Sequence, residues 1–296
     1  MEQVATATKP MWKKVWDFPL VAIIVAIALV AGWATIVTWV FGQLPENVGA
    51  AAGRALPSLA AVVGSFVLYK LVIRRLGWTK RDDLALPGAA RQFLLGVGGG
   101  FAIMSITVGI AALLGIYRVV AWEMGDDFAM ILFQGGITAG FIEELLFRGI
   151  LFRWFEELGG SWVALALTSI LFGLAHASND GATVLSTVAI MFEAGILLGA
   201  CYMYARSLWL PIGVHFAWNV TEGFIYDVPV SGHQVEGLVE AQVTGPEYLS
   251  GGMFGLEASI IALLVCTASG LFVLALAVRK GQVLGPAWRN RKPQSA

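Results

Sequence analysis

Long apolar segments separated by short polar connections make up most of the chain. A helix needs roughly 20 consecutive apolar residues to cross the hydrocarbon core of a bilayer, which is about 30 Å thick. The pattern therefore predicts an all-α protein, a polytopic transmembrane helical bundle of about eight spans. The fourth segment is long enough to tilt, whereas the fifth and seventh are short. The predicted spans are 19–41, 57–76, 92–115, 128–157, 161–177, 182–205, 208–226 and 253–278.

Composition supports the same class of protein. Hydrophobic residues make up 58% of the 296 residues and charged residues only 13%, and the mean hydropathy is +0.76. These values are far more apolar than those of an average soluble domain. The net charge of −1 argues against a nucleic-acid partner, which would call for a basic face. Cys201 and Cys266 fall in apolar segments, so we interpret them as small buried side chains.

Basic residues are concentrated in alternate connections, and this asymmetry orients the predicted bundle. Connections rich in Lys and Arg stay in the cytoplasm, so both termini are expected there, with an even number of spans. The intervening connections carry only Arg54 and Arg118, and the loop 227–252 is acidic. Glycine and proline in that loop predict irregular backbone, with His233 as a solvated bystander. The basic residues of the cytoplasmic side are Lys9, Lys13, Lys14, Arg74, Arg75, Lys80, Arg81, Arg91, Arg148, Arg153, Arg206, Arg279, Lys280, Arg289, Arg291 and Lys292.

The bundle is expected to form one domain, because the sequence has neither an internal repeat nor a linker. Residues 19–280 are assigned to it, between cytoplasmic tails at 1–18 and 281–296. Such a chain would be an integral, multi-pass protein of a bacterial-type plasma membrane, with lipid as a partner. Glycines in the third segment should let a neighbouring helix approach closely. They are Gly96, Gly98, Gly99 and Gly100.

Three ionisable side chains interrupt the fourth apolar segment: Glu143, Glu144 and Arg148. On insertion scales an ionised group at the bilayer centre costs about 2.5–3.5 kcal/mol, so such groups need shielded partners and mark functional sites by default. Glu144 and Arg148 stand four residues apart and can pair along one helix face, whereas Glu143 is rotated by about 100° from Glu144. We therefore interpret the pair as structural and Glu143 as the chemical group.

Two of the three histidines also fall within predicted spans. Phe172 and His176 share a helix face at i, i+4, and His215 and Asn219 have the same spacing. A carboxylate and two imidazoles can hold a hydrolytic water with the carboxylate as general base. They can also bind a divalent ion that activates the water. Asn219 offers an N–H donor to an oxyanion, so this group of residues suits peptide hydrolysis.

These residues resemble the motifs of a known family. The runs Glu143-Glu-x-x-Phe-Arg148, Phe172-x-x-x-His176 and His215-x-x-x-Asn219, with the stretch 195–211 before the last, are similar to those of the CAAX protease and bacteriocin-processing (CPBP) family. The resemblance covers about residues 128–226, which would be the catalytic core. It implies an eight-helix, glutamate-dependent intramembrane endopeptidase, often classed as a metalloprotease, whose active site is reached from the cytoplasmic side.

The resemblance also implies roles for individual residues. Glu143 would polarise water together with His176, and His215 with Asn219 would bind the oxyanion. If a metal ion takes part, Glu143, His176 and His215 are the candidate ligands, and zinc is the expected ion. The substrate would be a membrane-tethered or lipidated peptide or protein, as in CAAX processing or bacteriocin self-immunity. Three side chains would support this machinery: Glu144, Arg148 and Phe172.

Two other classes of function are open at this stage. A proton-coupled transporter also needs ionisable residues in its spans, and Glu193 in the sixth segment favours it. A transporter would be expected to show two matching halves with interrupted helices, and the sequence shows none. Within an enzyme, Glu193 could pair with a histidine or with Asn219. A non-catalytic immunity or scaffold protein is the second alternative, which the presence of all four predicted catalytic groups disfavours.

Overall fold

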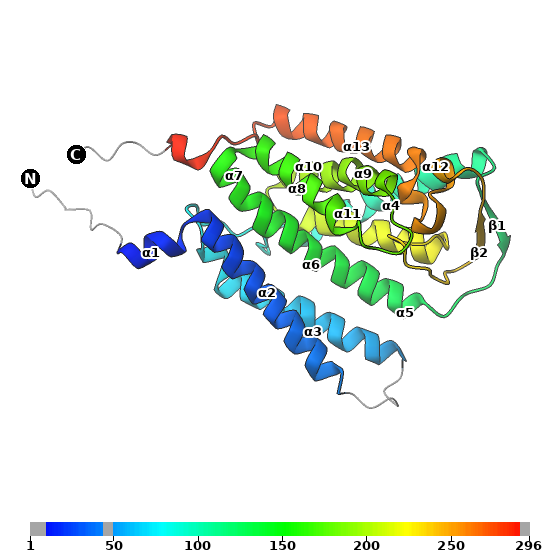
Figure 1. Cartoon of the computed structure of the whole chain (residues 1–296), viewed down its shortest axis with the longest axis horizontal. Helices are drawn as coiled ribbons and strands as arrows, with labels where there is room; N and C mark the ends of the chain where they lie inside the picture. The colour runs from blue at the N-terminus through cyan, green and yellow to red at the C-terminus, as the bar shows by residue number, and fades with distance from the viewer. Residues whose placement is uncertain (1–9, 44–49, 291–296) are drawn as a thin grey trace, which may run out of the picture.

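The structure, a computed structural model, describes residues 10–43 and 50–290 and is an all-α bundle with one small sheet (Figure 1). Within these ranges six helical stretches are long and apolar enough to cross a membrane. They are Pro19–Phe41 (α2), Ala52–Arg75, Ala89–Leu113 (α4), Phe128–Gly159, Val184–Ala205 and Ile260–Arg279 (α13).

The two predicted segments that remain form shorter helices. The fifth is α8 (Ser161–Ala175), and the seventh is α11 (Trp209–Val220) with a π-helical continuation, η5 (Thr221–Ile225). The polytopic helical fold is thus confirmed, whereas the number of eight spans and the cytoplasmic termini stay predictions. Of the basic residues counted above, Lys9, Arg291 and Lys292 lie outside the described residues.

The fourth segment is one continuous helix that carries two π-helical stretches. Its parts, in order, are α5 (Phe128–Met130), η2 (Ile131–Ala139), α6 (Gly140–Glu144), η3 (Leu145–Phe152) and α7 (Arg153–Gly159). A π-helical turn is rare and is frequently found at functional sites. Here α6, which ends with both glutamates, lies between two of them.

Close packing of α4 against α11 depends on two of the four predicted glycines. A Cβ on Gly96 would lie 2.3 Å from the Leu210 carbonyl oxygen, and one on Gly100 would lie 2.4 Å from that of Val214. The same construction at Gly98 and Gly99 meets nothing within 4 Å. The prediction of close approach is confirmed for Gly96 and Gly100 only. These two glycines fix the position of α11, which carries His215.

One end of the bundle is closed by a cap that the sequence did not predict. β1 (Tyr117–Ala121) pairs antiparallel with β2 (Glu240–Val243), and α12 (Glu247–Ser250) follows. Asp227 anchors the loop before β2 by accepting the Gly237 and Ala241 N–H groups at 2.7 and 2.9 Å. The expectation of an irregular loop over 227–252 was therefore wrong in part, because the loop contains strand β2. In this strand Gln242 pairs with Arg118 of β1, which lies far from it in sequence.

The opposite end holds a network of buried ion pairs. Glu156 accepts from Arg81 at 2.9 Å and from Arg206 at 2.8 Å, and Arg153 lies 3.7 Å from Asp83. Figure 1 places α1 (Met11–Trp16) and α7 at this end, opposite β1 and β2. The network ties the connections of this end together and so fixes the far end of the glutamate-bearing helix.

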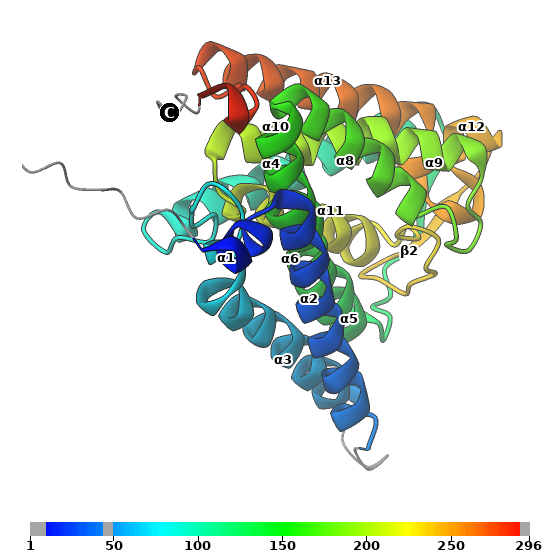
Figure 2. The same cartoon turned by 60° about the vertical axis from the view of Figure 1, so that its left-hand side comes forward.

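The first two spans form a pair at the side of the bundle. Trp33 in α2 donates its Nε1–H to the Ala60 carbonyl of α3 (Ala50–Leu71) at 3.0 Å. Figures 1 and 2 show α2 and α3 diverging together from the remaining helices, on the side opposite α13. The cavity that contains Glu143 lies among the other helices, and α3 packs against the glutamate-bearing helix over α5, η2 and α6.

Candidate active site

A cavity of about 270 Å³ brings together the four side chains predicted to be catalytic: Glu143, His176, His215 and Asn219. Glu143 comes from α6, His176 from the C-terminal end of α8, and His215 and Asn219 from α11. The side chain of Glu143 is 30% exposed and those of His176 and His215 are 12% and 9% exposed, so all three are accessible from the cavity. Their chemical roles stay predictions.

Both imidazoles present Nε2 to the same carboxylate oxygen. His176 Nε2 lies 3.9 Å from Glu143 Oε2, and His215 Nε2 lies 4.0 Å from it. These separations are too long for a direct hydrogen bond. They suit a single water that bridges the carboxylate oxygen and an imidazole nitrogen, at about 2.8 Å from each. Glu143 Oε2 is itself buried and has no hydrogen-bond partner among the described residues, so its capacity to accept a hydrogen bond is unused.

The second nitrogen of each imidazole ring, Nδ1, contacts an acceptor of the protein. His176 Nδ1 lies 2.8 Å from the Phe172 carbonyl oxygen, and His215 Nδ1 lies 3.0 Å from Glu144 Oε1. Since a carbonyl and a carboxylate only accept, each Nδ1 is assigned the proton, and each Nε2 of a neutral ring faces the cavity with a lone pair. The second contact fixes the tautomer and the ring orientation of His215, as carboxylates behind functional histidines do.

Glu144 and Arg148 form the intrahelical pair that their spacing predicts. Arg148 donates from Nη1 to Glu144 Oε1 at 2.8 Å, and both side chains are 0% exposed. Its Nη2 donates to the carbonyl oxygens of Ala194 and Gly195 at 3.1 and 3.3 Å. The guanidinium therefore joins the glutamate-bearing helix to the π-helical stretch η4 (Met191–Gly195).

Phe172 packs at the centre of these groups. Its ring centroid is 4.7 Å from that of His176 and 6.1 Å from that of His215. The Arg148 guanidinium carbon stands 4.7 Å from the same centroid, within range of a cation–π contact. One aromatic side chain thus packs against both imidazoles and the buried cation.

Asn219 makes one contact that limits its freedom. Its Nδ2 donates to the Gly135 carbonyl of η2 at 2.8 Å. An amide nitrogen carries two hydrogens, so one remains for a group in the cavity. The bond holds the carboxamide against the helix that carries Glu143.

The three candidate metal ligands do not fit an ion as they are placed. Tetrahedral zinc, with bonds of about 2.0–2.2 Å, sets neighbouring ligand atoms roughly 3.3–3.5 Å apart. The two imidazole nitrogens are 3.9 and 4.0 Å from Glu143 Oε2. In the described part of the chain no group of three or more His, Cys, Asp and Glu residues could hold a metal ion. We therefore derive no catalytic step through zinc, and its binding stays a prediction.

Sequence reasoning missed several residues of this cavity. Asn179, Ser231 and His233 line it; His233 is exposed, in agreement with the prediction of a solvated side chain, but it borders the cavity. Asn179 Nδ2 donates to the Ser231 carbonyl at 3.0 Å and so joins the turn after α8 to the cap. No signal in the sequence marks these polar residues, because they lie in loops whose positions depend on the whole fold.

Glu193 does not pair with a histidine or with Asn219, contrary to the sequence-based suggestion. It is 0% exposed, and neither carboxylate oxygen has a hydrogen-bond partner among the described residues. Nearby, Trp218 Nε1 donates to Glu222 at 3.0 Å and to Glu257 at 3.2 Å. Of these three buried carboxyls, only Glu257 lines a hollow shared with His176 and His215.

Replacing Glu193 by Gln is expected to leave peptide cleavage within about threefold of the parent. Glutamine has nearly the same shape, and Glu193 lines neither hollow beside the histidines. Cleavage rate and unfolding temperature should be measured on the same preparation. Loss of cleavage in a normally folded variant would add Glu193 to the catalytic set.

Comparison with known proteins agrees with this geometry. A family model described as type II CAAX prenyl endopeptidase Rce1-like matches residues 125–221, which include Glu143, His176, His215 and Asn219. A curated protein of Bacillus subtilis (strain 168), named "Putative membrane peptidase YdiL", is 22% identical in an alignment of 230 residues that covers 72% of this chain and 86% of that protein. Residues 125–221 are thus similar to a CPBP-type protease domain, as the sequence motifs predict.

The six long apolar helices, together with the similarity to a membrane protease family, make the chain an integral, multi-pass membrane protein. The family match covers the helices that surround the cavity and leaves α2, α3, α4 and α13 outside it. No solved structure matches the chain.

Proposed function

We propose that this protein is a CPBP-type intramembrane endopeptidase in which Glu143 is the general base. The observation that carries the proposal is the convergence of the two imidazoles. Each has its Nδ1 tied to an acceptor and its Nε2 about one water diameter from Glu143 Oε2, at 3.9 Å for His176 and 4.0 Å for His215. These separations support the proposal that the carboxylate and the imidazoles share a single nucleophilic water.

The reaction proceeds through addition of that water to the peptide carbonyl. Glu143 removes one proton as the water oxygen bonds to the carbonyl carbon, and His176 orients the water through Nε2. The C–N bond of the tetrahedral intermediate then breaks, and the proton held by Glu143 passes to the departing amine. The products are a carboxylic acid and an amine, and Glu143 is again ionised.

His215 and Asn219 stabilise the negative charge that develops on the carbonyl oxygen. Asn219 donates its remaining N–H, and His215 donates from Nε2 when both ring nitrogens carry protons. Glu144 supports the doubly protonated form of His215, because its carboxylate accepts the Nδ1–H of His215 at 3.0 Å. Donors held in this way are already oriented before the charge develops, so no further reorganisation is needed.

The substrate is a membrane-tethered peptide or a lipidated protein. Glu143 lies within a helix of 32 residues that is long enough to cross the membrane, so the scissile bond must reach into the bundle. The family match to a CAAX prenyl endopeptidase favours substrates with a lipid anchor near the cleavage site.

The test of the function is a comparison of protein termini in membranes. Cells that express the parent chain and cells that express Glu143→Gln should be compared by mass spectrometry of membrane-protein termini. New termini that depend on Glu143 support the proposal. An unchanged set of termini, with an immunity or transport phenotype that survives the substitution, would favour a non-catalytic role.

Removal of metal is expected to change the rate of cleavage by no more than about twofold, because the proposed general-base route needs no ion. The purified protein in lipid vesicles should be treated with a zinc chelator and its zinc content measured in parallel. A large loss that added zinc restores would assign Glu143, His176 and His215 as ligands. It would also mean that the side chains move closer together than their present 3.9 and 4.0 Å.

A further inference from the structure

The catalytic cavity extends from Glu143 toward only one end of the bundle. On the glutamate-bearing helix, the residues that line it all lie at or before position 143, and none of the described residues after that position lines it. The remaining walls come from the end of α8, from α11 and from the cap. The lining residues of the helix are Met130, Ile131, Gln134, Gly135, Ala139 and Glu143.

The opposite direction is closed by packed side chains. Glu144, Arg148, Phe152 and Trp154 follow Glu143 along the same helix and are all 0% exposed. Beyond them lies the network of Arg81, Glu156 and Arg206 described above. A peptide therefore has access to Glu143 from the cap side and is blocked on the other side.

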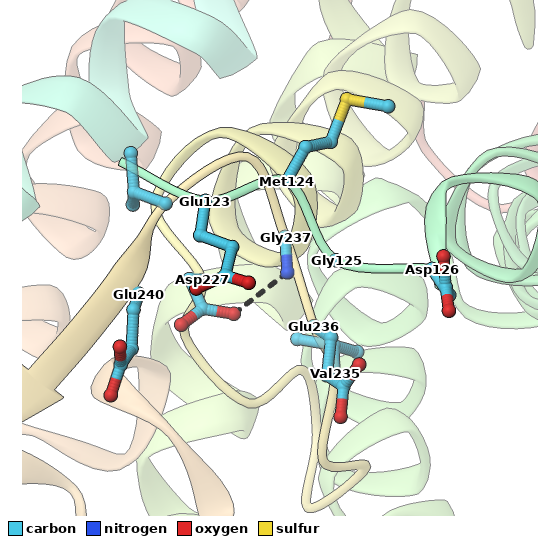
Figure 3. A pocket seen from close by; sticks show the side chains of 10 residues that line it. Glu123, Met124, Gly125, Asp126, Asp227, Val235, Glu236, Gly237 and Glu240 are labelled. Carbon is cyan, nitrogen blue, oxygen red and sulfur yellow. Dashed lines mark hydrogen bonds between the residues drawn. The ribbon is translucent and has the colours of Figure 1, made fainter. Parts of the chain in front are cut away.

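The two ends of the bundle differ strongly in charge. The closed end carries most of the described basic residues, among them Arg74, Lys80, Arg81, Arg153, Arg206 and Lys280. In the cap, Figure 3 shows carboxylates around a second hollow of about 600 Å³, which shares Val235 with the catalytic cavity. The acidic residues of that hollow are Glu123, Asp126, Asp227, Glu236 and Glu240.

The uneven distribution of Lys and Arg orients membrane proteins, because connections rich in these residues stay in the cytoplasm, whereas Asp and Glu contribute little. The closed end is then cytoplasmic, and the cap with the cavity entrance lies on the other face. The two expectations from the sequence, cytoplasmic termini and cytoplasmic access to the active site, cannot both hold. The ion-pair network with α1 and the cavity entrance with the cap lie at opposite ends of the molecule (Figure 1).

We propose that the catalytic cavity opens on the non-cytoplasmic face of the membrane, and that the substrates are peptide segments of anchored or exported proteins exposed on that face. This inference rests on the proposed function and specifies its substrate class. Prenylated cytoplasmic tails, the substrates implied by a CAAX-type enzyme, are on the wrong side of the membrane for this cavity.

Labelling of single cysteines tests the direction independently of activity. Gln234→Cys places a thiol on the exposed cap loop next to the cavity entrance, and Lys280→Cys places one at the basic end. The native Cys201 and Cys266 are free and buried, so they should contribute little background. Intact spheroplasts that express the full chain are treated with a charged maleimide that does not cross membranes.

Before permeabilisation we expect Gln234→Cys to be labelled at least about tenfold more than Lys280→Cys, and after permeabilisation both should be labelled equally. The tenfold margin allows for leakage and unequal thiol reactivity. Labelling of Lys280→Cys alone in intact spheroplasts would overturn the proposal.

A second measurement separates the direction of the cavity from the function itself. A charged fluorogenic peptide is added to sealed right-side-out vesicles and to inverted vesicles, with Glu143→Gln vesicles as the blank. Cleavage in right-side-out vesicles only supports the proposal, and cleavage in inverted vesicles only overturns it while leaving the protease function intact. Outward labelling without cleavage in either preparation would instead reject the protease function and, with it, the proposed substrates.

Discussion

Replacing Glu143 by Gln is expected to lower the rate of peptide cleavage by roughly 10²–10⁴-fold, the usual contribution of general acid–base catalysis. The carboxamide keeps the size of the side chain and can still bond a water, but it cannot take up a proton. The loss should therefore fall on kcat, with KM nearly unchanged. Initial rates on a lipid-anchored fluorogenic peptide in vesicles provide the measurement.

A matched control is available in Glu193→Gln, the same change at a buried carboxyl that lines neither hollow beside the histidines. Both variants must unfold at the same temperature as the parent for the comparison to count. Because Glu143 is 30% exposed to the cavity and makes no hydrogen bond through Oε2, its replacement should be tolerated structurally. A well-folded Glu143→Gln protein that keeps more than about a tenth of the parental rate would show that another group removes the proton.

Contacts within a single helix could be predicted from the sequence. The Glu144–Arg148 pair and the stacking of Phe172 on His176 both follow from i, i+4 spacing, which depends only on helical geometry. The same spacing placed His215 and Asn219 on one side of α11, and both line the cavity. The chemical groups of the site could therefore be predicted from the sequence, whereas its shape could not.

Contacts between helices could not be predicted in this way. The bond from His215 to Glu144 joins residues 71 positions apart and depends on how two helices are rotated about their axes. Spacing along the chain carries no information on that rotation. The sheet between β1 and β2 escaped prediction for a related reason, since each strand is short and neither has a partner near it in sequence.

The direction of the cavity is a third property that only the fold supplies. The sequence shows where basic residues gather, but it does not show on which side of Glu143 the helices are packed and on which side they leave a space. After Glu143 the large side chains of Arg148, Phe152 and Trp154 are fully buried, whereas before it Gly135 and Ala139 border the cavity. The small residues on that stretch help to keep the space open.

Replacing Arg148 by Met is expected to destabilise the protein by about 3–5 kcal/mol, the usual effect of removing one partner of a buried ion pair. Glu144 would remain fully buried without its cation, and the carbonyls of Ala194 and Gly195 would lose their donor. Arg148→Lys keeps the charge but cannot reach the carboxylate and both carbonyls at once, so an intermediate loss is expected. Unfolding of the purified variants by denaturant in a fixed detergent gives the free energies.

The double variant Glu144→Gln with Arg148→Met shows where the destabilisation comes from. If an unpaired charge is the cause, removing the carboxylate should restore part of the stability, by at least about 1 kcal/mol relative to Arg148→Met, as coupled neighbours do in a double-mutant cycle. Cleavage should not recover with it, because His215 would then face a neutral carboxamide at Nδ1 in place of the carboxylate that now lies 3.0 Å away. A single Arg148→Met variant that unfolds within about 1 kcal/mol of the parent would contradict the structural role of the pair. Recovery of stability without recovery of cleavage would separate the two functions of Glu144, one as the partner of a buried cation and the other as the group that positions His215.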